Sequence, residues 1–277
     1  MTVLLFTLVL LAGAILAGFL GSLTGLGGAV ILIPLLTLVF KVDIHYAIGT
    51  SLIAVIGTSS GAAAAYVKEG ITNIRLGMFL EIATTAGAVL GSFLIVYTPA
   101  NIITVIFGFV LIFSAVMTVR KKTLHIETED KSKMAAMLRL NSSYPDKGEQ
   151  IDYKIRHVPA GFFMMIGAGA LSSLLGIGAG AFKVLAMDNV MRIPFKVSTT
   201  TSNFMIGVTA AAGTAAYLHR GYIDPVLTFP VVVGVLAGSI FGSRILIGSD
   251  TKKLRVVFSI LISIIAIEMI YKGLKGH

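Results

Sequence analysis

The 277-residue sequence contains no cysteine, and only 13% of its residues are charged. The absence of cysteine excludes disulfide bonds, thiolate chemistry and cysteine-bound metals. A soluble domain usually carries about 25% charged residues, so this chain has too little charge to cover a water-exposed surface. What it has instead is apolar sequence, at 56% of all residues, in runs of about 20 residues. The sequence therefore predicts an all-α integral membrane protein.

Basic residues outnumber acidic ones by 22 to 13, which gives a formal net charge of +9. In a membrane protein such an excess gathers in cytoplasmic loops. We therefore expect a multi-pass protein of the cytoplasmic membrane rather than one that binds nucleic acid. The five histidines form no metal-ligand spacing, and Glu81 and Glu268 stand alone in apolar runs. Because paired catalytic groups are lacking, we expect no enzyme, no cofactor and no bound metal.

An internal duplication runs through the chain. The sequence AGFLGSLTGLGG at residues 17–28 returns as AGALSSLLGIGA at residues 168–179. The offset, 168 − 17 = 151, holds without a gap, and 20 of the 76 positions from Ala17 to Ser92 are identical at it. Biased composition produces scattered matches but not so long a register, so we infer that the two halves arose from one unit.

Each half is expected to contain about five helical segments. They span about 2–23, 28–40, 46–67, 74–97 and 99–119, then 158–175, 179–191, 197–218, 225–247 and 254–272. We interpret the charged stretch between the halves as a cytoplasmic loop or a short surface helix. The expected domains are a first transmembrane repeat at 1–119, the loop at 120–157 and a second repeat at 158–277.

The second segment of each half is too short to cross a bilayer. Its roughly 13 residues reach about 20 Å, whereas the hydrocarbon core is about 30 Å thick. Either the first two segments form a hairpin and the halves are inverted, or they form one broken crossing and the halves are parallel. With the charged loop in the cytoplasm, inversion puts 17 Lys and Arg residues inside and four outside, against 14 and seven for the parallel case. The positive-inside tendency favours two inverted-topology repeats.

Glycine-rich sequence precedes both short segments. Broken helix at membrane depth is tolerated only inside the protein or beside a water-filled cavity, and matched breaks in two halves point to a transport site. A half-helix that begins at such a break presents N–H groups without intrahelical partners and a partial positive charge. Glycine also lets an anion approach closely. We therefore predict that the breaks face each other near mid-membrane and bind an anion through Gly25, Gly27, Gly28, Gly176, Gly178 and Gly180.

Lys183 stands two turns into the second short segment, where the first half has Leu32. A lysine within a membrane helix is costly. It therefore lines the anion cavity, snorkels to the surface or pairs with Asp188, and we favour the cavity. Asp188 itself is expected to pair with Arg192, one helical turn further on.

Other polar side chains leave two interpretations open. Ser51, Ser202 and Asn203 lie near the starts of the third segments of the two halves, where they contact substrate or a coupling ion, or only bond the helix backbone. Glu81, which has Val232 as its counterpart, relays protons or is neutral and hydrogen-bonded.

The duplicated motif, GSLTGLGGAVILIPLL and SSLLGIGAGAFKVLAM, resembles the sulfite exporter TauE/SafE family of membrane permeases. The second copy departs from the pattern, since Ala179 interrupts the glycines, Leu185 replaces a proline and Lys183 is added. The resemblance implies transport of sulfite, sulfoacetate, thiosulfate or related organosulfonates across the cytoplasmic membrane. Because the sequence has no ATP-binding motif, a coupling proton or ion, or passive exchange, is expected.

From these observations we expect a secondary transporter that sits in the lipid bilayer and moves a small anion by alternating access. Two alternatives stay open: a transporter of another small anion, and a non-transporting accessory subunit that would lack an enclosed polar cavity. A homodimer is also left open by the sequence.

Overall fold

A computed structural model describes residues 3–24, 27–95, 97–119, 132–146, 149–248 and 252–275. The first half contains α1 (Val3–Thr24), α2 (Ala29–Pro34), a π-helical turn η1 (Leu35–Val39), α3 (Ile44–Lys68), α4 (Ile74–Leu94) and α5 (Ala100–Val119). The second half contains α7 (Val158–Leu175), α8 (Gly180–Leu185), η2 (Ala186–Val190), α9 (Phe195–His219), α10 (Pro225–Gly248) and α11 (Lys252–Lys275). With α2–η1 and α8–η2 each taken as one segment, these are the ten helical segments that the sequence predicts.

The element bounds repeat with the sequence. The elements α2, η1 and α3 begin and end at positions that return in α8, η2 and α9 after 180 − 29 = 151 residues. Left-handed backbone also returns at this offset, with φ of 54° at Lys41 and 58° at Arg192, and 68° at Gly70 and 72° at Gly221. The duplication is therefore visible in the turns as well as in the helices.

Helix ends follow from local sequence. The side chains of Asp43 and Asn73 accept hydrogen bonds from the backbone N–H groups of His45 and Leu76, and so cap the starts of α3 and α4. At the other end of α3, Gly70 adopts the left-handed conformation that lets the chain leave the helix. These caps set where each long helix begins and ends.

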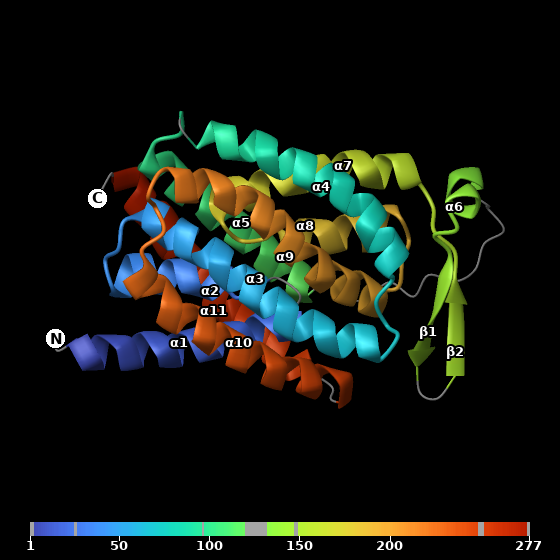
Figure 1. Cartoon of the computed structure of the whole chain (residues 1–277), viewed down its shortest axis with the longest axis horizontal. Helices are drawn as coiled ribbons and strands as arrows, with labels where there is room; N and C mark the ends of the chain where they lie inside the picture. Colours follow the sequence, from blue (N-terminus) through green and yellow to red (C-terminus); the bar gives the residue numbers. More distant parts are fainter. Residues whose placement is uncertain are drawn as a thin grey trace.

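The helices pack across the two halves (Figure 1). Helix α1 lies along α10, and α4 lies along α7, so that the first helix of each half packs on the fourth of the other. Helices α3 and α9 contact each other in the middle, and α5 contacts α11. In Figure 1, α1 starts at the left end of the bundle, whereas α7 starts at the right end, beside the strands.

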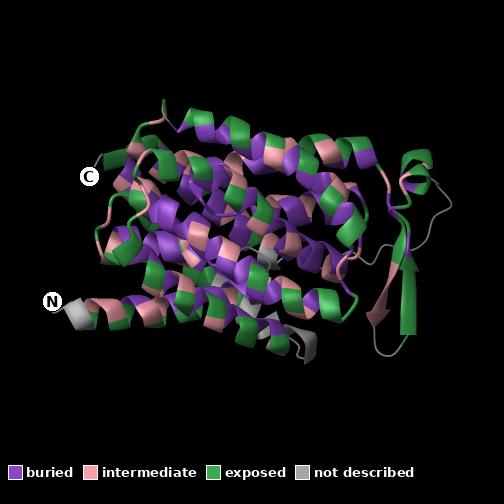
Figure 2. Ribbon diagram, in the orientation of Figure 1, coloured by how far each residue is buried: buried purple, intermediate pink, exposed green. Residues whose placement is uncertain are grey.

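Six helices among the described residues are long and apolar enough to cross a membrane. They are Leu5–Ser22, Ile44–Lys68, Ile74–Leu94, Ala100–Met117, Val158–Leu175 and Pro225–Arg244. Figure 2 shows buried residues gathered in the centre of the bundle, while exposed residues lie on the outer helices. Many of these exposed residues are large and apolar, such as Met78, Phe163 and Phe229. Exposed apolar surface of this extent suits lipid, and the chain is a multi-pass membrane protein.

The region between the halves contains a small helix and a β-hairpin. After α6 (Lys133–Met137), strands β1 (Ser142–Asp146) and β2 (Glu149–Tyr153) pair in antiparallel register. The sequence analysis expected a loop or a surface helix here and missed the hairpin. The strands are short and mostly polar, and apolar side chains alternate in them only at Ile151 and Tyr153.

Contacts with the bundle hold the hairpin in place. The Asn73 side chain donates hydrogen bonds of 2.9 Å to the Tyr153 hydroxyl and to the Leu140 carbonyl oxygen. Burial raises the pKa of Tyr153 to about 12, so its hydroxyl stays neutral at physiological pH. Because Asn73 also caps α4, this hairpin end is tied to the start of a membrane helix.

Candidate functional site

Two breaks interrupt the membrane segments at equivalent places. The first lies between α1 and α2, where Gly27 has a φ of 77°, and the second lies between α7 and α8, where Gly176 and Gly178 each have a φ of 68°. These values favour glycine. Ala179 also adopts a left-handed φ of 47°. Gly25, the remaining glycine of the predicted site, lies outside the described residues.

The two breaks meet in the centre of the protein. A Cβ atom placed on Gly27 would lie 3.6 Å from the carbonyl oxygen of Ile177, in the other break. It would also contact Val55 and Ile206, and a Cβ atom on Gly178 would contact the same two side chains. Val55 and Ile206 are themselves equivalent at the offset of 151. The breaks thus face each other across one pair of matched apolar residues.

The half-helices that begin at these breaks have uncapped starts. Gly28 and Ala179 occupy the N-cap positions of α2 and α8, and no side chain caps either described helix start. Together with its π-helical turn, the first half-helix continues from Ala29 to Val39. The first N–H groups of such a helix lack intrahelical acceptors and carry partial positive charge. Of the glycines predicted to bind the anion, Gly28 is the N-cap residue of α2 and Gly180 is the first residue of α8.

Predicted hydroxyl and amide groups lie beside the breaks. The Ser51 hydroxyl donates to the Gly176 carbonyl oxygen at 2.9 Å, across the two halves. Ser202 donates to the Gly180 carbonyl oxygen at 3.3 Å, within its own half. The Asn203 amide donates to the Ser22 carbonyl oxygen at 3.5 Å, at the end of α1. The structure therefore brings the three side chains to the breaks, where they bond the backbone.

Lys183 is completely buried in α8 and belongs to a chain of hydrogen bonds. Its ammonium group donates to the Thr209 hydroxyl on α9 at 2.5 Å, and that hydroxyl donates to Oε1 of Glu81 on α4 at 2.6 Å. Complete burial means that Lys183 does not snorkel to either surface. Its polar contact is with Thr209, so Thr209 and Glu81 join the site.

The duplication gives this cluster an apolar counterpart elsewhere in the chain. At the offset of 151, Lys183, Thr209 and Glu81 correspond to Leu32, Thr58 and Val232. Leu32 and Thr58 are fully buried, and the Thr58 hydroxyl donates to the Ala54 carbonyl oxygen of its own helix at 3.0 Å. The threonine is therefore common to the two equivalent clusters, whereas both charges belong to the cluster around Thr209, with Glu81 from the first half and Lys183 from the second.

Sequence reasoning missed Thr209 as well as two serines near the second break. The hydroxyls of Ser172 and Ser173, in the last turn of α7, are buried and have no hydrogen-bond partner among the described residues. A buried polar group without a partner costs about 1–3 kcal/mol. The two hydroxyls are thus free to contact a ligand at the break. Ser173 could have been found through its repeat partner Ser22, but composition gave no reason to select it.

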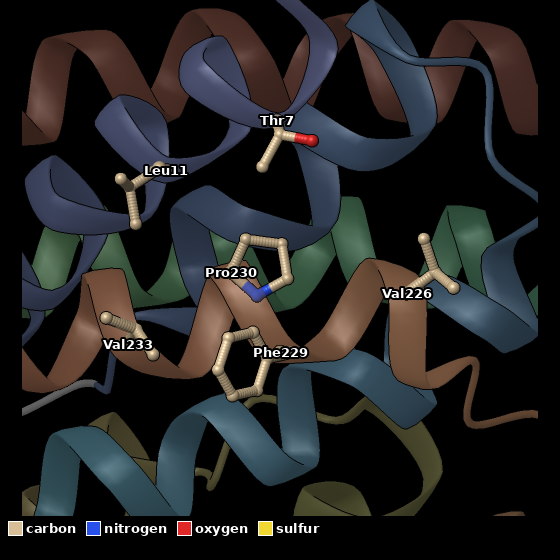
Figure 3. Close-up of a pocket in the computed structure, with 6 residues that line it drawn as sticks. All are labelled: Thr7, Leu11, Val226, Phe229, Pro230 and Val233. Carbon is tan, nitrogen blue, oxygen red and sulfur yellow. The ribbon is translucent and has the colours of Figure 1, made fainter. Parts of the chain in front are cut away.

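A groove on the outside of the bundle has a different character. Thr7 and Leu11 of α1 and Val226, Phe229, Pro230 and Val233 of α10 line a space of about 440 Å³ (Figure 3). Five of the six lining residues are apolar, and Val226 and Phe229 are largely exposed. Such a surface suits lipid chains and offers no charge to an anion. The candidate site is therefore the centre of the bundle.

Comparison with protein families gives a match over nearly the whole chain. The family model described as "Sulfite exporter TauE/SafE" matches residues 10–269, which is nearly the whole chain. The chain belongs to the sulfite exporter TauE/SafE family. Both breaks and all members of the charged cluster fall inside the matched range, so the resemblance seen in the glycine motifs is confirmed.

Curated relatives of this TauE/SafE protein are described as transporters. It is 27% identical to the "Probable membrane transporter protein YunE" of Bacillus subtilis over 274 residues, which cover 96% of this chain and 98% of that protein. It is 29% identical to YdhB of the same organism, covering 87% and 89%. It is 25% identical to MJ0441 of Methanocaldococcus jannaschii, covering 96% of each chain. No solved structure matches the chain.

Proposed function

We propose that this protein is a secondary transporter that moves small sulfur-containing anions across the cytoplasmic membrane by alternating access. Sulfite, sulfoacetate, thiosulfate and related organosulfonates form the substrate class, and membership of the sulfite exporter family supports this choice. The observation that carries the proposal is a fully buried lysine, Lys183, in the half-helix α8 that begins at one of two breaks in contact with each other. Charged residues inside membrane segments are costly and mark ion or substrate pathways.

In this proposal the anion binds where the half-helix starts converge. The backbone N–H groups near Gly28 and Gly180 and the Lys183 ammonium supply positive charge. The hydroxyls of Ser172 and Ser173, which have no partner among the described residues, supply further donors. Ser51, Ser202 and Asn203 hold the breaks in shape through their bonds to backbone carbonyls.

We propose further that the two halves are inverted in the membrane. The opposite starting ends of α1 and α7 in Figure 1 support this arrangement. Basic residues support it as well. Arg75 and Lys196, which inversion places inside, donate to the carbonyl oxygens of Arg139 and Pro145 in the charged loop. Lys272, which inversion places outside, donates to the Thr37 carbonyl oxygen instead.

Alternating access explains why the site is closed in the structure. The side chains of Val55 and Ile206 fill the space beside both breaks, and Lys183 has no exposed surface. An anion therefore reaches Lys183 only after a movement of the surrounding helices. In our proposal, the α1–α10 and α4–α7 pairs move against the central α3 and α9 and open the site to one side at a time.

The test is flux in proteoliposomes. We expect wild-type protein to take up labelled thiosulfate or sulfite in preference to chloride. The double variant Lys183→Leu with Glu81→Val reproduces the residues of the equivalent cluster around Thr58. It is expected to lose flux by about tenfold or more, because a hydrogen bond to a charged group contributes about 1.5–3 kcal/mol.

The control is Glu268→Gln, which changes an exposed carboxylate of α11 and is expected to leave flux at the wild-type level. Wild-type protein that moves none of these anions would overturn the proposed function and favour an accessory subunit. Equal flux through the double variant would remove Lys183 from the site.

A further inference from the structure

Glu81 has an unusual environment for a carboxylate. Its Oε1 atom accepts from Thr209 at 2.6 Å and from Thr85 at 3.3 Å, whereas Oε2 is buried and has no hydrogen-bond partner among the described residues. The residue is 8% exposed. A carboxylate kept only for stability would have both oxygens paired. One oxygen is therefore available to take up a proton.

Lys183 is the charged group that acts on Glu81. Of the elements packed against α4, helix α7 (Val158–Leu175) contains no Asp, Glu, Lys, Arg or His. Lys196 and His219 lie at the two ends of α9, and Lys196 donates to the Pro145 carbonyl oxygen. On α4 itself, Arg75 lies in the first turn and donates to the carbonyl oxygen of Arg139. Uptake of a proton by Glu81 therefore depends on the position of one charged group, the Lys183 ammonium.

Thr209 connects the two charges in a defined order. A hydroxyl has one proton to donate and two lone pairs to accept with. The ammonium of Lys183 can only donate, so Thr209 accepts from it and directs its own proton to Oε1 of Glu81. Any ligand that takes the Lys183 ammonium away from Thr209 therefore weakens the hold on the Glu81 carboxylate.

The fold does not need this charged pair. At the equivalent positions, Leu32, Thr58 and Val232 carry no charge, and Leu32 and Thr58 are fully buried. Because buried ion pairs give little net stability compared with apolar side chains of similar size, the pair has to be explained by something other than packing.

We propose that Glu81 is the proton-coupling residue of the transporter: it serves as the counter-ion of Lys183 when the site is empty, and it takes up one proton at Oε2 when the substrate anion replaces it. This inference rests on the proposed function. The proton comes from water on the side to which the site is open, and it leaves Glu81 when the anion departs on the other side.

Charge balance gives the reason for the exchange. The empty site contains Lys183 as a cation and Glu81 as an anion, so the net charge is zero. With a monovalent anion bound and Glu81 protonated, the net charge is zero again. A bound anion beside an ionised Glu81 would leave a net negative charge in a low-dielectric interior, which is strongly unfavourable. One proton therefore accompanies each anion.

The experiment compares two modes of transport in proteoliposomes with methanesulfonate, a monovalent organosulfonate that carries no proton of its own at neutral pH. The first mode is exchange of labelled against unlabelled methanesulfonate at equal pH. The second is uptake driven by a pH gradient, alkaline inside, with the membrane potential clamped at zero. One proton per anion sustains about a tenfold accumulation for a gradient of one pH unit.

We expect wild-type protein to show both modes. Glu81→Gln keeps a side chain of the same shape that cannot titrate, so it is expected to exchange methanesulfonate, at an altered rate, and to lose the tenfold accumulation. Glu268→Gln is the matched control and is expected to keep it. Accumulation by Glu81→Gln equal to that of the control would overturn the inference while the proposed function stands.

A measurement on wild-type protein covers the case in which Glu81→Gln fails to fold. A pH dye inside the vesicles is expected to report acidification as methanesulfonate enters, and entry without acidification would overturn the inference. Absence of thiosulfate, sulfite and sulfonate exchange by wild-type protein would overturn the proposed function and this inference with it.

Discussion

Thr209 and Thr58 occupy equivalent positions in the two halves, but their neighbours differ. Thr209 lies between Lys183 and Glu81, whereas the Thr58 hydroxyl bonds to the carbonyl oxygen of Ala54 in its own helix. The backbone elements around both threonines begin and end at matching residues. Since the positions equivalent to Lys183 and Glu81 hold Leu32 and Val232, the duplicated elements form with the two charges in one cluster and without them in the other. Because buried charges in membrane helices are costly, we interpret Lys183 and Glu81 as functional residues.

The largest effect is expected from breaking the charged pair. Glu81→Val leaves a buried ammonium without its carboxylate, and removing one partner of a buried ion pair costs about 3–5 kcal/mol. The double variant Glu81→Val with Lys183→Leu, which copies the equivalent cluster around Thr58, is expected to recover most of this loss. Thermal and denaturant unfolding in detergent measure the loss of stability in the single variant and its recovery in the double variant. Equal losses in the single and double variants would show that the two charges do not interact.

A smaller effect is expected from the bridging hydroxyl. Thr209→Val removes the group between two charges and leaves them partly unpaired, which costs about 1–3 kcal/mol. Thr58→Val removes one ordinary hydrogen bond and is expected to cost about 0.5–1.5 kcal/mol. Unfolding midpoints of the two variants give the comparison directly. If Thr58→Val proved as costly as Thr209→Val, the bridge would have no special role.

The smallest difference is expected where the halves are chemically alike. The Tyr66 hydroxyl donates to the Ser22 carbonyl oxygen at 3.0 Å, and the Tyr217 hydroxyl donates to the Ser173 carbonyl oxygen at 3.1 Å. Tyr66→Phe and Tyr217→Phe should each cost about 0.5–1.5 kcal/mol, with nearly equal values. Unfolding of the two variants under one condition checks this. Clearly unequal losses would mean that the halves are less similar in energy than in geometry.

The sequence predicts most of the fold because apolar length and the duplication supply independent evidence for the same elements. The second short segment, for example, is expected at 179–191 and is found as α8 and η2 at 180–190. The hairpin at Ser142–Tyr153 could not be predicted in this way. It is held in place by hydrogen bonds from Asn73, which is far away in the sequence, and its own residues form no pattern long enough to predict a strand.

The site could be predicted in part. The glycine motifs placed the breaks, and Lys183 was selected because it is a charge at membrane depth. Thr209 and Glu81 were not connected to it, because the contact joins three helices and leaves no local pattern. One signal was available in the sequence: Lys183 and Glu81 are charges of opposite sign that interrupt the duplication, where their counterparts are Leu32 and Val232.

The most direct test of the account is binding of an anion at Lys183. Thermal unfolding of wild-type protein is measured with and without thiosulfate, next to the Lys183→Leu, Glu81→Val double variant. A ligand at 100 times its Kd stabilises the native state by about 2.7 kcal/mol. The account predicts a stabilisation of this size for wild-type protein and none for the double variant. Equal stabilisation of both proteins would show that the anion binds without Lys183 and would contradict the account.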